Sequence, residues 1–383
     1  MIEIHKKEDC CGCHACFQIC PKKCISMQED EEGFLYPHVD KENCINCGLC
    51  EKVCPVINQS EPHKPLKVYA AKNPNEEIRM ASSSGGIFTL LAERTINNGG
   101  VVFGAKFNDK WEVVHDFTET VEGIAPFRGS KYVQSTIGDN FQKAEQFLKQ
   151  GREVLFTGTP CQIAGLHKYL RKDYSNLIAV DVVCHGVPSP LVWREYLKEI
   201  SGNETLKSIS FRDKSTGWKS YSTKYAFKDK CIMQKASKDI YIQGFLKNLY
   251  LRPSCYACPS KAGKSESDIT IADYWGIQVK HQELDDDKGV GLILVNNEKG
   301  LSLFRVLNID IQETSYEDAF IGNQMIERSV ISSKYRMKFW HNYEINGIGE
   351  IAIMCNKIKS ISHIKERLRK FYYVYKLIHN LFK

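Results

Sequence analysis

The chain has 383 residues with a formal net charge of +6, which is long enough to build several domains. The positive charge is concentrated in residues 356–383, where eight Lys or Arg residues face a single acid, Glu366. The rest of the chain therefore has a net charge near zero. This charge distribution excludes a protein that is basic over its whole surface and coats nucleic acid. The longest apolar runs, such as 177–183, are the length of a strand, so we expect no membrane-spanning helix.

Eight of the ten cysteines in the first 54 residues form the spacing C-x2-C-x2-C-x3-C-P twice. Three close thiolates of each repeat can hold one corner of a cuboidal iron-sulfur cluster, while the fourth, before a proline, reaches the partner cluster. We therefore expect two [4Fe-4S] clusters with crossed ligation. Their ligand sets are Cys10, Cys13, Cys16 and Cys54 for one, and Cys44, Cys47, Cys50 and Cys20 for the other.

Other uses of these cysteines fit the spacing less well. Zinc sites need paired cysteines or histidines at longer spacing, and disulfides need an oxidising compartment. The start of the chain shows no secretory signal, so we expect a reducing cytoplasm. Cys11 and Cys24 belong to neither ligand set. His14, which lies between Cys13 and Cys16, is expected on the surface and not as a ligand. With short strands at 25–27 and 34–39, residues 1–60 are expected to form an α+β ferredoxin-like two-cluster domain.

A polar, proline-containing stretch at 58–67 predicts a linker, and a new region should begin near Val68. We expect a strand at 68–71, a helix after the loop Ser82-Ser83-Ser84-Gly85-Gly86, and a strand at 101–107. Serine hydroxyls and free N–H groups at a helix start favour anion binding. A flexible linker or a simple helix cap is the alternative.

Two strand–loop–helix units follow and predict a parallel sheet. The strand at 153–157 leads through Gly158-Thr159-Pro160-Cys161 to a helix at 162–170. The strand at 177–183 leads through Cys184-His185-Gly186 to a helix at 191–200. Ligands bind at the carboxyl ends of such strands, where Cys161 and Cys184 lie. Either cysteine alone would be an ordinary buried residue.

A further pair, Cys255 and Cys258, lies in a proline-flanked loop. Together with Cys161 and Cys184 it makes four thiols, enough for a third [4Fe-4S] cluster if they meet in space. Cys231 and Cys355 have no such companions, so we expect them to be unligated. A β-hairpin is predicted at 206–227, a strand at 267–273 ends in Asp273, and the last clear strand is at 290–295.

In this combination the sequence resembles the beta subunits of coenzyme F-420-reducing hydrogenases and dehydrogenases, with their bacterial and plastid relatives. The resemblance covers roughly residues 5–330. It rests on the doubled cysteine motif and on six short motifs in the same order: Ser82 to Gly86, Gly129-Ser130-Lys131-Tyr132-Val133, Gly158 to Gln162, Cys184 to Pro188, Arg252 to Cys258, and Asp273-Tyr274-Trp275-Gly276.

The resemblance implies an iron-sulfur flavoprotein in which FAD exchanges a hydride with an organic substrate or a deazaflavin-like cofactor. It also favours the third cluster on Cys161, Cys184, Cys255 and Cys258. Lys131 would place a positive charge near phosphate or the flavin ring. The implied cofactor-binding residues are Ser82, Ser83, Ser84, Gly85, Gly86, Gly129, Ser130, Lys131, Tyr132, Thr157, Gly158 and Thr159. His185 and Asp273 are candidates for catalysis.

The implied architecture is an α+β ferredoxin-like domain followed by an α/β flavoprotein domain with a mainly parallel sheet. Its expected boundaries are 1–60 for the first domain, 66–150 and 151–345 for the two parts of the second, and 356–383 for a basic amphipathic helix. Three readings of that helix stay open: packing on its own domain, contact with the inner face of the membrane, and, least favoured, nucleic acid.

We expect a cytoplasmic oxidoreductase that exchanges electrons with ferredoxin or a partner oxidoreductase subunit and acts on a small organic substrate. Nucleic acid is not an expected partner. Bacterial members of the family suggest a role in cell-surface polysaccharide synthesis. The alternatives are a non-catalytic electron-transfer adaptor that docks on a partner enzyme, and a membrane-bound scaffold for glycan enzymes.

Overall fold

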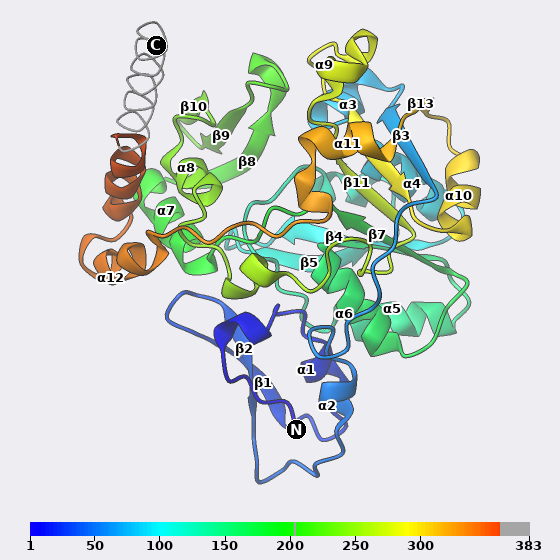
Figure 1. Cartoon of the computed structure of the whole chain (residues 1–383), viewed down its shortest axis with the longest axis vertical. Coiled ribbons are helices and arrows are strands. Elements are labelled where there is room, and N and C mark those ends of the chain that lie inside the picture. The colour runs from blue at the N-terminus through cyan, green and yellow to red at the C-terminus, as the bar shows by residue number, and fades with distance from the viewer. Residues whose placement is uncertain (203, 361–383) are drawn as a thin grey trace, which may run out of the picture.

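The computed structural model describes residues 1–202 and 204–360. Its largest part is built on one eight-stranded sheet (Figure 1). In spatial order the strands are β13 (Asp310–Glu313), β3 (Lys67–Lys72), β12 (Gly291–Val295), β11 (Ile269–Asp273), β7 (Leu177–Val182), β6 (Val154–Gly158), β4 (Val101–Phe107) and β5 (Val113–Thr118).

The sheet is mixed, so the expectation of a mainly parallel sheet is wrong. Only the centre is parallel, where β11, β7, β6 and β4 pair in one direction. The pairs of β12 with β11 and β3, of β13 with β3, and of β5 with β4 are antiparallel. β5 follows β4 through a short turn, and such a hairpin connection can only make an antiparallel pair. Strands β3, β4 and β5 precede residue 150 and the other five follow it, so both expected parts of the second domain, 66–150 and 151–345, contribute to this one sheet.

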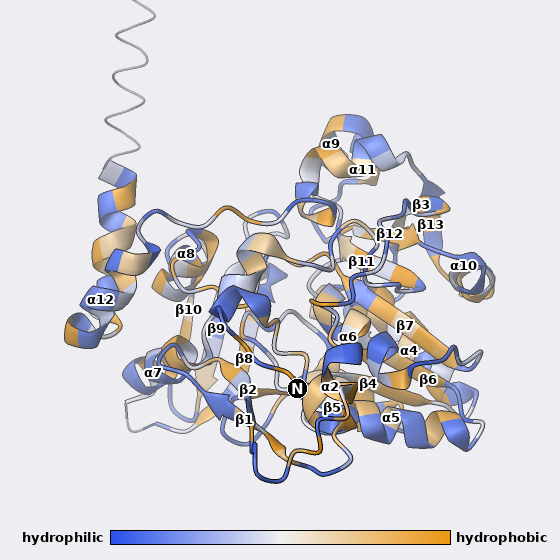
Figure 2. Cartoon of the chain, turned by 60° about the horizontal axis from the view of Figure 1, so that its bottom comes forward, coloured by the Kyte–Doolittle hydropathy of each residue, from blue (hydrophilic) through white to orange (hydrophobic). Residues whose placement is uncertain are grey.

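Helices cover both faces of the central strands, because successive side chains of a strand point to opposite faces. Val101 and Phe103 of β4 pack with α5 (Asn140–Lys149) and α6 (Pro160–Leu170), whereas Val102 packs with α4 (Ile87–Asn97) and α10 (Glu298–Arg305). The central strands are accordingly strongly hydrophobic in Figure 2. This rigid core fixes the loops at the carboxyl ends of β6, β7 and β11.

Start signals in the sequence explain the two helices that flank these loops. Thr159 caps α6 in a capping box with Gln162, and Pro160 occupies the first turn. Ser189 accepts from the N–H of Val192 at the start of α7 (Pro190–Ser201). The remaining helices of the body are α3 (Glu76–Ala81), α8 (Ile240–Leu246), α9 (Ile277–Lys280), α11 (Tyr316–Gly322) and α12 (Arg336–Asn346).

A three-stranded antiparallel sheet forms a second structural unit of the body. It orders β10 (Cys231–Lys235), β9 (Ser222–Phe227) and β8 (Leu206–Asp213), and its core includes side chains of α7, α8 and α12. The predicted hairpin is β8 and β9. β10 and β13 were not predicted.

The N-terminal module contains the hairpin of β1 (Ile25–Glu29) and β2 (Leu35–Val39) with two short helices, α1 (Ala15–Ile19) and α2 (Leu49–Lys52). α1 lies against α6, below the large sheet in Figure 1. Cys11, Cys13 and Ala15 belong to the same hydrophobic core as the inner face of α6. The module is therefore packed directly on the body.

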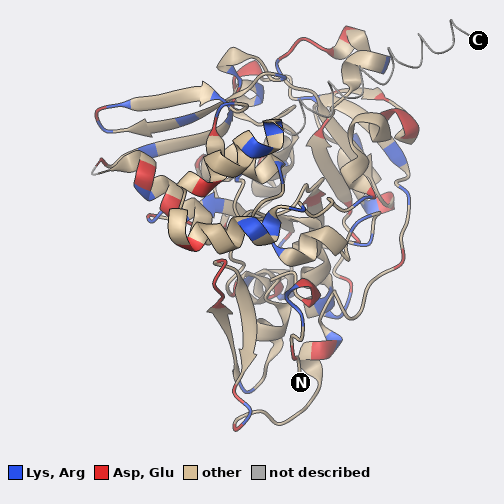
Figure 3. Cartoon of the chain, turned by 60° about the vertical axis from the view of Figure 1, so that its left-hand side comes forward, with Lys and Arg blue, Asp and Glu red and all other residues tan. Residues whose placement is uncertain are grey.

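A further helix covers residues 349–360. It includes the start of the expected basic helix at 356–383, whose remaining residues, 361–383, lie outside the described residues. In the part that the structure describes, no helix is both long and apolar enough to cross a bilayer. Basic and acidic residues are interspersed over the elements seen in Figure 3.

Candidate functional site

The first cysteine site combines three thiols of the first motif with one of the second. It is the cavity lined by Cys10, Cys13, Cys16 and Cys54. Burial raises the pKa of the Cys16 thiol, and the neighbouring Cys10 and Cys54 raise it further. The left-handed backbone at Gly12, with φ of 70°, lets the chain turn between the ligands.

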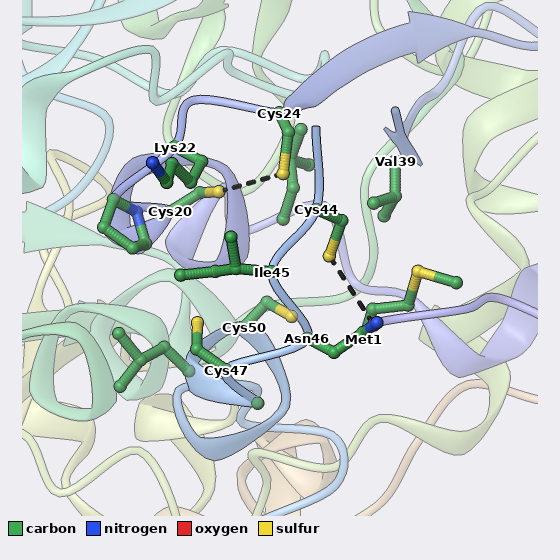
Figure 4. A pocket seen from close by; sticks show the side chains of 14 residues that line it. Met1, Cys20, Lys22, Cys24, Val39, Cys44, Ile45, Asn46, Cys47 and Cys50 are labelled. Carbon is green, nitrogen blue, oxygen red and sulfur yellow. Dashed lines mark hydrogen bonds between the residues drawn. The ribbon is translucent and has the colours of Figure 1, made fainter. Parts of the chain in front are cut away.

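The second cysteine site has the reverse composition and is drawn in Figure 4. It encloses about 360 Å³ of space free of protein atoms, part of it open to solvent, and its thiols are Cys20, Cys44, Cys47 and Cys50. Cys24 is a fifth thiol at this site, with its sulfur 3.4 Å from that of Cys20. In each motif, the cysteine that precedes the proline therefore lines the site formed by the other motif: Cys20 lines the second site and Cys54 the first. This is the crossed arrangement expected for two-cluster ferredoxins.

The third cysteine site unites residues from three separate segments of the body. Cys161 lies in the first turn of α6, Cys184 follows β7, and Cys255 and Cys258 lie in and after a 3-10 helix at Pro253–Ala257. Burial raises the pKa of Cys255, and Cys184, Cys161 and Cys258 add to the effect, so the four sulfurs are neighbours. Burial raises the pKa of Cys184 to about 12 and that of Cys258 to about 11.

The donor chemistry of the three sites fits iron-sulfur clusters. Backbone N–H groups donate to two of the sulfurs, from Ile2 to Cys50 at 3.2 Å and from Val187 to Cys255 at 3.4 Å, as is usual around clusters. Within residues 1–202 and 204–360, no three His, Cys, Asp or Glu side chains gather closely enough for a single metal ion. Thiolates of a cuboidal cluster bind different irons and so lie farther apart than the ligands of one ion.

The first and third sites are directly connected. The thiol of Cys11, which belongs to neither ligand set, packs in one hydrophobic cluster with Cys13 of the first site and Cys161 of the third. Gly165 also lies against the first site, because a Cβ at this position would be 3.0 Å from the Cys13 sulfur. Cys161 and Gly165 are four residues apart on α6, a rise of about 6 Å. One helix turn therefore joins the two sites.

A cationic and aromatic cluster lies at the same edge of the sheet. The N–H of Ser130 donates to Ser83 Oγ at 2.7 Å, which joins the two motifs predicted to bind a cofactor. Arg212 donates to both carboxylate oxygens of Asp273, at 2.9 and 3.0 Å, and to the hydroxyl of Tyr132 at 3.3 Å. Asp273 also accepts from the indole N–H of Trp218 at 2.7 Å.

Aromatic rings enclose the Arg212 guanidinium of this cluster. It lies over the ring of Tyr221 at 4.1 Å and over that of Trp275 at 5.1 Å. Trp275 in turn stacks on Trp218 at 4.7 Å with nearly parallel planes. The Nε of Arg212 is buried without a hydrogen-bond partner in the described structure.

Lys131 is held beside this cluster by two backbone carbonyls. Its ammonium donates to Pro126 at 2.9 Å and to Arg128 at 2.8 Å, and burial lowers its pKa to about 7. Lys214, which donates to the carbonyl of Ser84 at 2.9 Å, has its pKa lowered by burial to about 8. Arg212, Lys214 and Trp218 were not predicted from the sequence, because they lie on or beside the predicted hairpin and follow no recognisable spacing.

Several predicted residues have structural partners instead of facing this cluster. Gly85 is packed against backbone, since a Cβ would lie 2.3 Å from the carbonyl oxygen of Ala71. Thr157 donates to the carbonyl of Phe103 at 2.9 Å, and the Thr159 hydroxyl lies 3.3 Å from the Cys161 sulfur. His185 is bonded to Asn248 at 2.7 Å.

His14 was expected on the surface, and that is wrong. Its side chain is buried beside the first site, and burial together with Arg252 lowers its pKa to about 4. The docking of the N-terminal module on the body, which the sequence does not reveal, covers it. Of the two cysteines expected to be unligated, Cys231 is exposed and Cys355 is buried in the core around α12.

Two family models match the chain. Residues 151–318 match the model described as the C terminus of the coenzyme F420 hydrogenase/dehydrogenase beta subunit, and residues 9–58 match that of a 4Fe-4S dicluster domain. No curated protein matches the sequence. Among solved structures, a chain of the F420-reducing [NiFe] hydrogenase complex from Methanosarcina barkeri aligns with 72% of this chain and 98% of its own length, at 15% identity and a TM-score of 0.47.

Proposed function

Because the chain belongs, through residues 151–318, to the coenzyme F420 hydrogenase/dehydrogenase beta subunit family and carries a 4Fe-4S dicluster domain at 9–58, we propose that it is an iron-sulfur flavoprotein oxidoreductase. It passes electrons between an external donor and a small organic substrate or deazaflavin-like cofactor. The observation that carries the proposal is the row of thiol sites that leads from the N-terminal module to the body. When bound, the clusters would supply one-electron transfer and FAD would supply hydride transfer.

The twelve cysteines of the three sites would hold three [4Fe-4S] clusters. The second site is the outermost, and its Cys47 is exposed, which makes it the contact point for an electron-carrying partner protein. The first site lies inside it, one turn of α6 from the third site, and the Cys11 thiol spans the gap. Short separations of this kind favour electron transfer between neighbouring sites.

The cationic and aromatic cluster would bind the flavin and present it to substrate. Ser83, Ser130 and Lys131 supply a hydroxyl, an N–H and a positive charge suited to the diphosphate. Arg212 and the rings of Tyr132, Tyr221 and Trp275 suit the planar ring system. Asp273 holds the Arg212 guanidinium in place through two hydrogen bonds and so orients it.

A second candidate function is a non-catalytic electron-transfer adaptor, favoured by the exposed position of Cys47 at the outer end of the module. Such an adaptor would bind the clusters and dock on a partner oxidoreductase subunit, but it would bind no flavin. The two candidates therefore differ in cofactor content.

Anaerobic purification followed by iron, sulfide and flavin analysis tests the proposal. We expect about twelve irons per chain, from four in each of three clusters, and one FAD. Eight irons would remove the third cluster, and a fully metallated protein that binds no added FAD would favour the adaptor. Colourless protein after reconstitution with iron and sulfide would overturn both functions.

A further inference from the structure

Arg252 is a fully buried cation that joins the body to the first cysteine site. Only 1% of the residue is exposed, and it directly precedes the loop that carries Cys255 and Cys258. Its guanidinium donates to the carbonyls of Cys10 at 2.8 Å and Leu35 at 2.9 Å and to the amide oxygen of Gln134 at 2.9 Å. The Nη2 group also points at the Cys10 sulfur, at 3.5 Å.

The charge of Arg252 has no carboxylate partner. Within residues 1–202 and 204–360 no salt bridge includes it, and its other neighbours are the rings of Tyr36 at 4.3 Å and Phe34 at 5.3 Å. A buried charge is costly unless an opposite charge compensates it. Four thiolates around a [4Fe-4S] core carry a net negative charge, which grows by one unit on reduction.

Among the residues that the structure describes, the second site has no cation that is both fully buried and without a carboxylate partner. The Cys50 sulfur accepts from the backbone N–H of Ile2. The cations that line the site are Lys22, which is exposed to solvent, and the N-terminal ammonium of Met1, whose charge is paired with Glu51 at 3.5 Å. Exposed charges are screened by water and salt far more than buried ones. The two sites of the N-terminal module therefore differ in local electrostatics although their ligand motifs are the same.

We propose that Arg252 is a positioning residue for electron transfer, whose buried charge and hydrogen bond to Cys10 hold the first cluster at a higher reduction potential than the second. The inference rests on the proposed function, since it requires the clusters. A positive charge stabilises the reduced form of a cluster more than the oxidised form. Electrons arriving at the outer cluster would then collect at the inner one, next to Cys11 and the third site.

The competing explanation is that Arg252 only anchors the N-terminal module on the body. A second arginine offers a matched comparison, because Arg336 also joins the body to the module. It forms an ion pair with Glu32, with one N–O distance of 2.9 Å, and donates to the carbonyl of Leu251 at 3.0 Å, but no cysteine sulfur in the described part of the chain accepts from it. Loss of Arg336 should therefore weaken an anchor and leave the cluster charges unchanged.

The test is an EPR-monitored redox titration of the anaerobically purified full chain and of Arg252→Gln, Arg252→Lys and Arg336→Gln. Signals are assigned with Cys16→Ala and Cys50→Ala, which each disturb one cluster of the module. In Arg252→Gln we expect the midpoint of the first cluster to fall. At a fixed potential its reduced-to-oxidised ratio should drop about tenfold, or about 59 mV for a one-electron couple.

Arg252→Lys keeps the charge, so its midpoint should lie between those of Arg252→Gln and the wild type, while Arg336→Gln and the second cluster should keep wild-type values. Equal midpoints in Arg252→Gln and wild type, or equal shifts in Arg252→Gln and Arg336→Gln, would overturn the inference while the clusters remain. Absence of all cluster signals in the wild type would instead contradict the proposed function.

A measurement on the wild type covers the case in which Arg252→Gln fails to fold. With arginine labelled by ¹⁵N in the guanidino group, pulsed EPR of the reduced protein should show a ¹⁵N coupling on the first cluster's signal. In a fully reduced sample, the lack of such a coupling would overturn the inference.

Discussion

Asp273 and Arg212 show how one buried pair supports a binding site at the level of single residues. The side chain of Arg212 is 4% exposed and that of Asp273 16%, and Trp218 adds a third hydrogen bond. Removing one partner of a buried pair leaves the other charge uncompensated. The arrangement therefore stabilises the fold only while it is complete.

We expect Asp273→Asn to lower the free energy of unfolding by about 3 kcal/mol and to weaken FAD binding. The double variant Arg212→Gln/Asp273→Asn should lose less stability than the single one, because no buried charge is left alone. Chemical denaturation measures both. As a control, Glu313→Gln breaks the exposed pair with Lys67 and should cost less than about 1 kcal/mol. A similar small loss for Asp273→Asn would contradict the structural role.

Lys131 gives a pH dependence whose direction follows from its burial. In the free protein its pKa is about 7, and a bound diphosphate would raise that value. FAD should therefore bind most tightly below pH 7 and lose affinity, by up to about tenfold per pH unit, as pH rises above 7. The neighbouring His115 has its pKa lowered by burial to about 4 and stays neutral throughout.

Fluorescence titration with FAD between about pH 7 and pH 9 measures this loss of affinity. In Lys131→Met the affinity should be lower at pH 7 and nearly independent of pH over the same range. If wild type and Lys131→Met changed in parallel, another group would be responsible.

At the level of elements, α6 is the part that aligns two cysteine sites. Gly165→Ala should favour the helix by about 1 kcal/mol, because alanine is the better helix former. However, the new Cβ would lie 2.8 Å from the Cβ of Cys13, so the N-terminal module must shift. We expect the clash to dominate, with a net loss of about 1–3 kcal/mol in stability and a lower iron content in the first site.

Thermal unfolding and iron analysis of Gly165→Ala check this prediction against Gly349→Ala. Gly349 is also helical, and a Cβ there would meet nothing within 4 Å, so its substitution should be neutral or stabilising. Normal iron content and raised stability in Gly165→Ala would show that α6 does not press on Cys13 in the assembled protein.

For the whole molecule, the proposed electron path requires the third site. Cys258→Ala should remove the third cluster and keep the first and second, because Cys258 lines neither of those two sites. After mixing with a reduced ferredoxin, the remaining clusters of the variant should become reduced. Its FAD should still be oxidised at the time by which the wild type has reduced its own FAD. Rapid-mixing absorbance follows both, with exposed Cys231→Ser as the control. Unchanged flavin reduction would rule out the third site as an obligatory step.

The sequence predicted local elements well where neighbouring residues decide the outcome. The strand at 101–107 and the helix after Gly86 appear as β4 and α4, since hydrophobic periodicity and helix-start signals act over a few residues. The mainly parallel sheet was a wrong prediction, because pairing direction depends on which distant strands meet. The sequences of β10 and of the edge strand β13 have only weak hydrophobic patterns, so neither strand was predicted.

What the sequence alone determined was the ligand chemistry, because the identity and spacing of the N-terminal cysteines are covalent facts of a short segment. Only the tertiary structure decided what surrounds those thiols. It brought Cys161, Cys184, Cys255 and Cys258 together, set Cys11 between two sites, buried His14, and inserted Arg252 beside Cys10. These contacts join residues far apart in the chain, so they depend on how the module docks on the body and leave no local pattern.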